Sequence, residues 1–175
     1  MKKAILPILF FCIALIVSKS SFSQFDKIYL HNGKVNEGSV IRVDGFIVAY
    51  KFKGEDAEQI SSKYAVKKIV YKSGREEDIS EKVIVNGKDD WEKVVILENV
   101  SQISGLTKGG EIKGKTSMIN YRSNSGSEKI AMRRLKEEAA EQGCPFVLIT
   151  SDRGTTRSFG FGGSQDQKRG IAYKY

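Results

Sequence analysis

Apolar and polar residues alternate one by one through much of the segment 26–80, and this period of two predicts β-strands. The clearest alternation covers residues 46–53, where an aromatic or aliphatic side chain takes every second position. An Asn-Gly pair at 32–33 and an Asp-Gly pair at 44–45 separate such runs. Both pairs are typical of tight hairpin turns, because their residues tolerate positive φ. The pattern predicts strands over 27–31, 35–43, 46–53, 58–61, 67–72 and 75–79.

Five or six short strands within about 55 residues favour a small, strongly bent barrel that closes its own edges. The same segment resembles a β-module of secreted Bacteroidota proteins, through D-K-I-Y-L-H-N-G at 26–33 and V-K-K-I-V-Y-K-S-G at 66–74. The resemblance implies an SH3-like or Sm-like all-β barrel. Its motifs are turn and core positions, so they specify a fold without specifying a chemistry.

The hydrophobic period changes in the second half, where one helix is predicted after a capping box at 125–128. Four apolar residues fall on one face of this helix at helical spacing, and Gly143 with Pro145 ends it. With the strands predicted around it, the order is β-β-α-β-β, an α+β sandwich of one main helix on a sheet. The apolar helix face comprises Ala131, Met132, Leu135 and Ala139, and the strands are 91–97, 111–118, 146–150 and 170–175.

The domain organisation follows from these patterns. A small barrel domain at 24–80 is joined by a linker at 81–92, which lacks strong periodicity, to an α+β domain at 93–175. The region 105–175 resembles the YbjQ family and the related domain of the Rcs-system envelope sensor lipoprotein. The resemblance implies the α+β fold and, by analogy with the Rcs sensor, a role in envelope-stress signalling. It is carried by Gly110-Glu111-Ile112, Leu135-Lys136, Gly143-Cys144, Phe146-Val147-Leu148-Ile149 and Gly170-Ile171-Ala172.

The first 23 residues have the order of a secretory signal peptide: Lys2 and Lys3, an apolar core at 4–17, and small polar residues at 18–23. We predict cleavage after Ser23 and a periplasmic or secreted protein without a stable membrane span. Cys12 lies inside the apolar core, where no lipobox cysteine would be, so we expect no lipid anchor.

Charge adds a constraint on partners. The full chain has a formal net charge of +8, and loss of three lysines with the signal peptide would leave +5. This mild excess, in an exported protein, does not favour nucleic acid binding. It allows affinity for an anionic envelope component.

Candidate chemistry is sparse in the mature chain, which has one histidine, His31, and one cysteine, Cys144. A metal site or a catalytic triad needs several ligands or partners that this set does not supply, so we predict no metal, no cofactor and no catalytic residues. Cys144 follows a helix C-terminus, where the dipole disfavours a thiolate, so a buried thiol is expected. The alternative is a reactive thiol that forms mixed disulfides, because an unpaired cysteine stands out in an oxidising compartment.

A glycine-rich loop at 158–164 is the feature most typical of a binding surface, because two phenylalanines among glycines are flanked by basic residues. We therefore predict an exported, non-catalytic binding or adaptor protein that contacts an envelope protein or an anionic envelope component. An envelope-stress sensor and an enzyme with an unrecognised site are the alternatives, and self-association stays open. The predicted contact residues are Arg157, Phe159, Phe161, Lys168 and Arg169.

Overall fold

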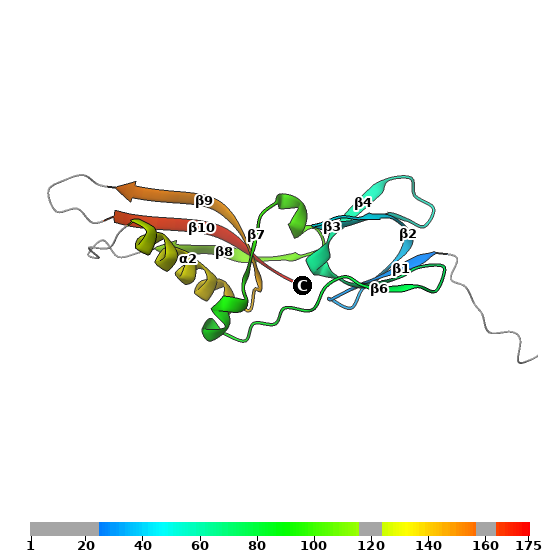
Figure 1. The fold of residues 1–175 in the computed structure, drawn as a ribbon, viewed down its shortest axis with the longest axis horizontal. Coiled ribbons are helices and arrows are strands. Elements are labelled where there is room, and N and C mark those ends of the chain that lie inside the picture. The colour runs from blue at the N-terminus through cyan, green and yellow to red at the C-terminus, as the bar shows by residue number, and fades with distance from the viewer. Residues whose placement is uncertain (1–24, 116–123, 157–163) are drawn as a thin grey trace, which may run out of the picture.

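The computed structural model describes residues 25–115, 124–156 and 164–175. These residues form two β-sheets and one long helix, and the two halves lie end to end along the molecule (Figure 1). The chain is therefore an α+β protein that is mostly β-sheet, as the sequence predicts. Among the described residues, no helix is long and apolar enough to cross a membrane.

The first sheet contains all six predicted strands, each within a few residues of its predicted bounds. Its order is β4-β3-β2-β1-β5-β6, with every neighbouring pair antiparallel. Gly33 has φ +88°, the conformation predicted for the Asn-Gly turn, whereas Gly45 is not among the glycines with positive φ. The strands are β1 Asp26–Leu30, β2 Val35–Val43, β3 Ile47–Phe52, β4 Glu58–Ser62, β5 Val66–Val70 and β6 Glu76–Asp78.

The expected closed barrel is wrong, because β4 and β6 stand at opposite ends of the strand order and do not pair with each other. The sheet is strongly curved but open (Figure 1). The C-terminal end of β4 instead meets the second half of the chain, where the Ser62 N–H donates to the Ser104 carbonyl at 2.7 Å. The edge that closure would have used is thus partly covered, which is another way to protect an exposed strand.

The second half has the predicted β-β-α-β-β order and a four-stranded sheet, β7-β9-β10-β8. β7 runs parallel to β9, and the other pairs are antiparallel. The first predicted strand begins later than expected, because residues Lys88–Lys93 form a 3-10 helix, η2. A second such helix, η3, covers Val100–Ile103. The remaining elements are β7 Val95–Leu97, β8 Thr107–Lys115, α2 Asn124–Glu141, β9 Phe146–Thr156 and β10 Ser164–Lys174.

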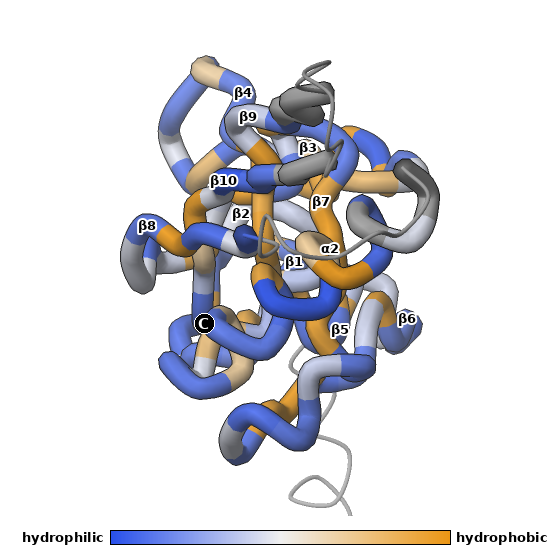
Figure 2. The backbone as a smooth tube through the Cα atoms, turned by 90° about the vertical axis from the view of Figure 1, so that its left-hand side faces the viewer, coloured by the Kyte–Doolittle hydropathy of each residue, from blue (hydrophilic) through white to orange (hydrophobic). Residues whose placement is uncertain are grey.

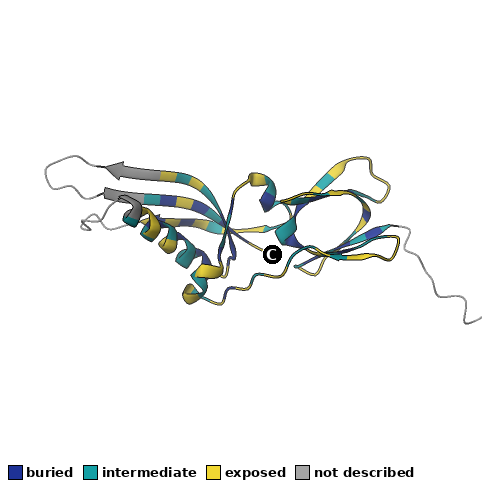
Figure 3. Ribbon diagram, viewed as in Figure 1, coloured by how far each residue is buried: buried dark blue, intermediate teal, exposed yellow. Residues whose placement is uncertain are grey.

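Helix α2 covers one face of this sheet through the predicted apolar stripe. Ala131, Leu135 and Ala139 are fully buried, while Met132 is half-buried at the margin of the same cluster. The burial pattern alternates along β8 and around α2 (Figure 3). Gly114 of β8 lies against the helix so closely that a Cβ there would be 2.0 Å from the Ala131 carbonyl oxygen. The helix therefore rests on backbone at this point.

The two halves share an apolar cluster at their junction. Phe146 and Tyr173 from the second sheet are buried there together with Leu97, and Tyr64 of the first half packs against them. The Tyr64 and Phe146 ring centroids are 5.1 Å apart. Apolar tracts, orange in Figure 2, run through the middle of the molecule when it is viewed along its long axis. The two sheets are thus joined by packing as well as by the chain.

The segment predicted as a linker, 81–92, packs against the second half at two places: under α2 and at the end of β10. Val85 is buried in the cluster under α2. The Val83 N–H donates to the Tyr175 hydroxyl at 2.8 Å, which ties this segment to the end of β10.

Candidate functional site

The face of the four-stranded sheet that turns away from α2 is the first candidate surface. Ile112 and Gly114 of β8 face the helix, so the residues between and beside them face the other way. Toward the junction this face is covered by the shared apolar cluster. Next to Phe146 and Tyr173 of this cluster, the face carries a group of residues that we call the open face: Glu111, Lys113, Lys115, Leu148, Arg169 and Ile171. Leu148 and Ile171 pack against the cluster, and the charged residues lie beside them.

Basic residues stand side by side on the open face. Arg169 lies directly opposite Lys113 on the neighbouring strand, and Lys115 is two residues further along β8. All three are exposed, and none forms an ion pair with a residue in the described ranges. Like charges directly opposite each other on neighbouring strands destabilise a sheet. Arg169, a predicted contact residue, thus belongs to a wider basic surface that the sequence analysis did not find.

Lys168, the adjacent predicted contact residue, points to the helix side. Its side chain is 1% exposed and its ammonium lies 3.3 Å from a Glu128 carboxylate oxygen of α2 and bonds to Asp152 of β9. Burial alone would lower the pKa of Lys168, but hydrogen bonds to Asp152 and Glu128 raise it above its ordinary value. Lys168 therefore fastens α2 to the sheet and is not displayed to a partner.

The other predicted contact residues, Arg157, Phe159 and Phe161, lie outside the described residues. Their role in contact with a partner stays a prediction.

Cys144 is buried at the end of α2, with 1% of its surface exposed. A Cβ added to Gly109 would be 2.3 Å from its Sγ, so the sulfur is packed tightly against β8. Burial raises the pKa of the Cys144 thiol, and the charge of Lys174 opposes this only in part. The neutral thiol is favoured, which does not suit a reactive nucleophile.

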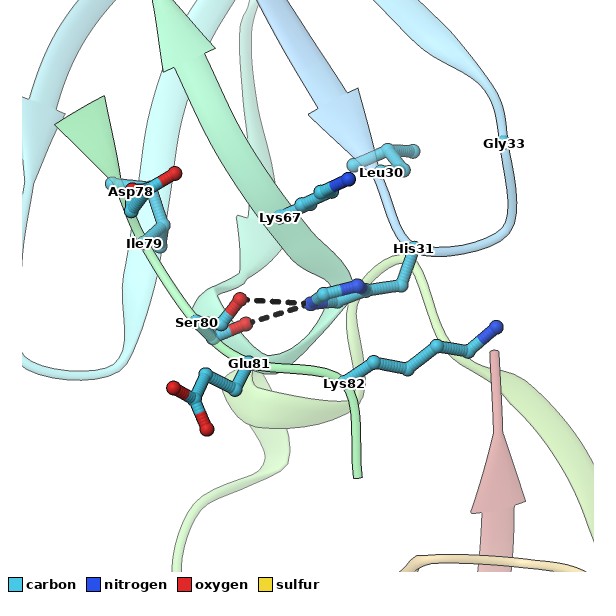
Figure 4. Close-up of a pocket in the computed structure, with 9 residues that line it drawn as sticks. All are labelled: Leu30, His31, Gly33, Lys67, Asp78, Ile79, Ser80, Glu81 and Lys82. Atoms are coloured by element: carbon cyan, nitrogen blue, oxygen red, sulfur yellow. Dashed lines mark hydrogen bonds between the residues drawn. The ribbon is translucent and has the colours of Figure 1, made fainter. Parts of the chain in front are cut away.

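A pocket of about 780 Å³ lies beside the end of β1, and we call it the junction pocket (Figure 4). His31 stands between Lys67 of β5 and Lys82 of the segment after β6, and the oxygens of Ser80 face its Nε2. The T-shaped contact of the His31 and Tyr175 rings, with centroids 5.0 Å apart, holds the imidazole from the side of the second half. Asp78 and Glu81 also line the pocket, and the Glu81 carboxylate points away from the imidazole.

The hydrogen bonds of His31 fix its tautomer. Nε2 lies 3.1 Å from the Ser80 carbonyl oxygen and 3.0 Å from Ser80 Oγ. The Ser80 hydroxyl already donates to the Val66 carbonyl at 2.8 Å, so both Ser80 oxygens accept from an Nε2–H. In the neutral ring, Nδ1 is then the unprotonated nitrogen.

Burial lowers the pKa of His31 below its usual 6.5; the bond to Ser80 opposes this shift, and Lys82 and Lys67 add to it. The ring is therefore neutral at pH 7. In the part of the chain that the structure describes, no three His, Cys, Asp or Glu residues gather as a metal site would require. His31 follows β1 of the first sheet, and Cys144 lies between α2 and β9 in the cluster under the helix, so the structure does not bring the two candidate chemical groups together.

No family model matches this chain, and no curated protein matches it. The resemblances to the YbjQ family and to the secreted β-module stay predictions. Function has to be inferred from the fold and the side-chain geometry.

Proposed function

We propose that the mature chain is an exported, non-catalytic binding or adaptor protein that captures an acidic protein segment in the bacterial envelope through the open face. One observation carries this proposal: Lys113 and Arg169 lie opposite each other, exposed and unpaired among the described residues, on a sheet face that α2 leaves free.

Electrostatics supports an acidic partner. Two cations at neighbouring strand positions repel each other, and carboxylates placed above them would remove the repulsion and add charge-assisted hydrogen bonds. Glu111, on the same face, is exposed and forms no ion pair with either cation. Arrays of one sign accelerate association and select partners of the opposite sign.

The apolar residues of the open face favour protein over other anions. Leu148 and Ile171 pair across β9 and β10 and are half-buried, next to the cations. An apolar centre with a charged rim is typical of protein–protein contacts. A polypeptide that carries both carboxylates and apolar side chains matches this combination.

Charge reversal at Lys113 and Arg169 of the open face tests the proposal. We expect Lys113→Glu with Arg169→Glu to weaken binding of an acidic, leucine-containing model peptide at least about tenfold, because attraction becomes repulsion. The matched control is Lys34→Glu with Lys72→Glu, two exposed lysines of the first half, which changes the net charge equally. Fluorescence anisotropy at low salt gives both affinities. Equal losses in the two double variants would reduce the effect to net charge and overturn the proposal.

The export part of the proposal depends on residues 1–23 acting as a signal peptide. We expect the protein recovered from the periplasm or medium of the producing bacterium to begin at Gln24, because small residues precede that position. N-terminal sequencing checks this. A chain that retains Met1 and stays with the cytoplasmic fraction would contradict the envelope part of the proposal.

A further inference from the structure

The junction pocket combines three features of a ligand site. Its volume of about 780 Å³ lies within the range of small-molecule sites, it contains a half-buried imidazole, and two lysines flank that imidazole. None of the ion pairs among the described residues includes Lys67 or Lys82. The Lys82 ammonium instead lies over the Tyr175 ring, with its Nζ 5.4 Å from the ring centroid.

We propose that the junction pocket binds the carboxylate or phosphate group of a small molecule, with Lys67, Lys82 and Nδ1 of His31 as the recognition groups. The pocket shares no residue with the open face, so this site is independent of the adaptor role. The ligand chemistry is that of an oxyanion, which two lysines and a protonated imidazole can surround with charged donors.

The His31 pKa depends on the charged groups around the imidazole. Its titration can therefore report the binding of an anion to the pocket. The groups that face it are Lys67 from β5, Lys82 from the segment after β6, and Tyr175 from the end of the chain. Burial raises the pKa of the Tyr175 hydroxyl, and the bond from Val83 opposes this, so the phenol is neutral near pH 7. The electrostatic influences on the His31 pKa come from the two lysines. Asp78 and Glu81 also line the pocket, and the Glu81 carboxylate points away from the imidazole.

Binding of an oxyanion therefore couples to uptake of a proton. An anion between the lysines cancels their effect on the imidazole and stabilises its charged form, so Nδ1 gains a proton and becomes a donor. By linkage, oxyanion affinity rises as the pH falls through the pKa of His31. Chloride, which lacks the geometry of an oxyanion, should shift this pKa less.

The experiment uses the fact that His31 is the single histidine of the chain, so its imidazole C–H resonances are unique in NMR spectra. In sodium chloride, we expect the mature protein to titrate below 6.5. At equal ionic strength, saturating acetate or dimethyl phosphate should raise the pKa by about one unit, because an opposite charge then lies beside the imidazole. A rise with acetate alone assigns a carboxylate ligand, and a rise with dimethyl phosphate alone assigns a phosphate.

Matched variants separate a site from general screening. In Lys67→Met with Lys82→Met, the pKa in chloride should itself increase, because two repelling cations are gone, and the further rise with oxyanion should vanish. Lys72→Met, which removes an exposed charge outside the pocket, should keep the full rise. Thermal unfolding confirms that the variants are folded. No rise with either oxyanion in the unaltered protein, or an equal rise in the double variant, overturns the proposal.

Discussion

Replacing Gly114 by alanine is expected to lower the free energy of unfolding by about 2–3 kcal/mol, because α2 rests on the backbone at this position. A Cβ at Gly114 would be 2.0 Å from the Ala131 carbonyl oxygen and 2.8 Å from the Leu135 backbone nitrogen. Both neighbours are backbone atoms of a helix, which cannot rotate away as a side chain can. The helix would have to lift from β8 and open the cluster around Leu135.

Gly45→Ala is the matched control, because a Cβ there meets nothing within 4 Å and Gly45 is not among the glycines with positive φ. It should change stability by less than about 0.5 kcal/mol, or slightly raise it through the unfolded state. Urea denaturation of both variants, followed by circular dichroism and by Trp91 fluorescence, makes the comparison. Equal stabilities of the two variants would show that α2 does not lie on β8 as described.

The strand pattern of the first half was predictable because side-chain alternation and turn chemistry act locally. Val48 and Tyr50 are buried, as their phase predicts, and Gly33 adopts the left-handed turn. Ala49, of opposite phase, is also buried, because β3 is a central strand with Ile60 beside it on β4. Local alternation cannot show which side chains of the neighbouring strands lie beside a small residue on the outer face.

Two predicted contact residues, Lys168 and Arg169, lie in a part of β10 that the sequence analysis did not predict as a strand. Strand β10 begins at Ser164, six residues before the predicted start at 170. A longer predicted strand would have placed Lys168 in phase with Gly170 and Ala172, on the helix side, and Arg169 outward. The pairing of Arg169 with Lys113 depends on strand register, which neither segment reveals alone.

The junction pocket lay beyond sequence reasoning for a related reason. His31 and Ser80 are 49 positions apart, and the pairing of β1 with β5 brings their segments together, because Ser80 bonds to Val66 of β5. The sequence contains a single histidine, and this reveals no local partner for it. What the sequence could not show is that Ser80 bonds to this histidine and that Lys67 and Lys82 lie beside it.

The curvature of the first sheet is held in part by one buried carboxylate, Asp26, at the start of β1. It is 7% exposed, and its two oxygens accept from different segments: Oδ2 from the Val40 N–H and Oδ1 from the Lys72 N–H, each at 2.8 Å. Val40 lies in β2, and Lys72 lies in the turn between β5 and β6. At the N-terminal end of β1, one side chain thus joins β2 on one side to the turn after β5 on the other.

Asp26→Ala is therefore expected to cost about 3 kcal/mol, because two charge-assisted hydrogen bonds are lost and two N–H groups lose their acceptor. Asp26→Asn should recover only part of this, since an amide offers one acceptor oxygen and would place a donor against the other N–H. Asp44→Ala is the control: its carboxylate is half exposed and pairs with Arg42 at the surface, so the cost should stay below about 1 kcal/mol.

Amide hydrogen exchange distinguishes the loss of these two hydrogen bonds from a general loss of stability. In Asp26→Ala, the Val40 and Lys72 amides should exchange much faster than the Ile69 amide in the middle of β5, because the end of the sheet opens before its centre. If Val40 and Lys72 stay as protected as in the unaltered protein, the carboxylate does not hold the two segments. A selective loss at these two amides would show that the joining of β2 and the β5–β6 turn to the start of β1 depends on a tertiary contact that no pattern of hydrophobic residues encodes.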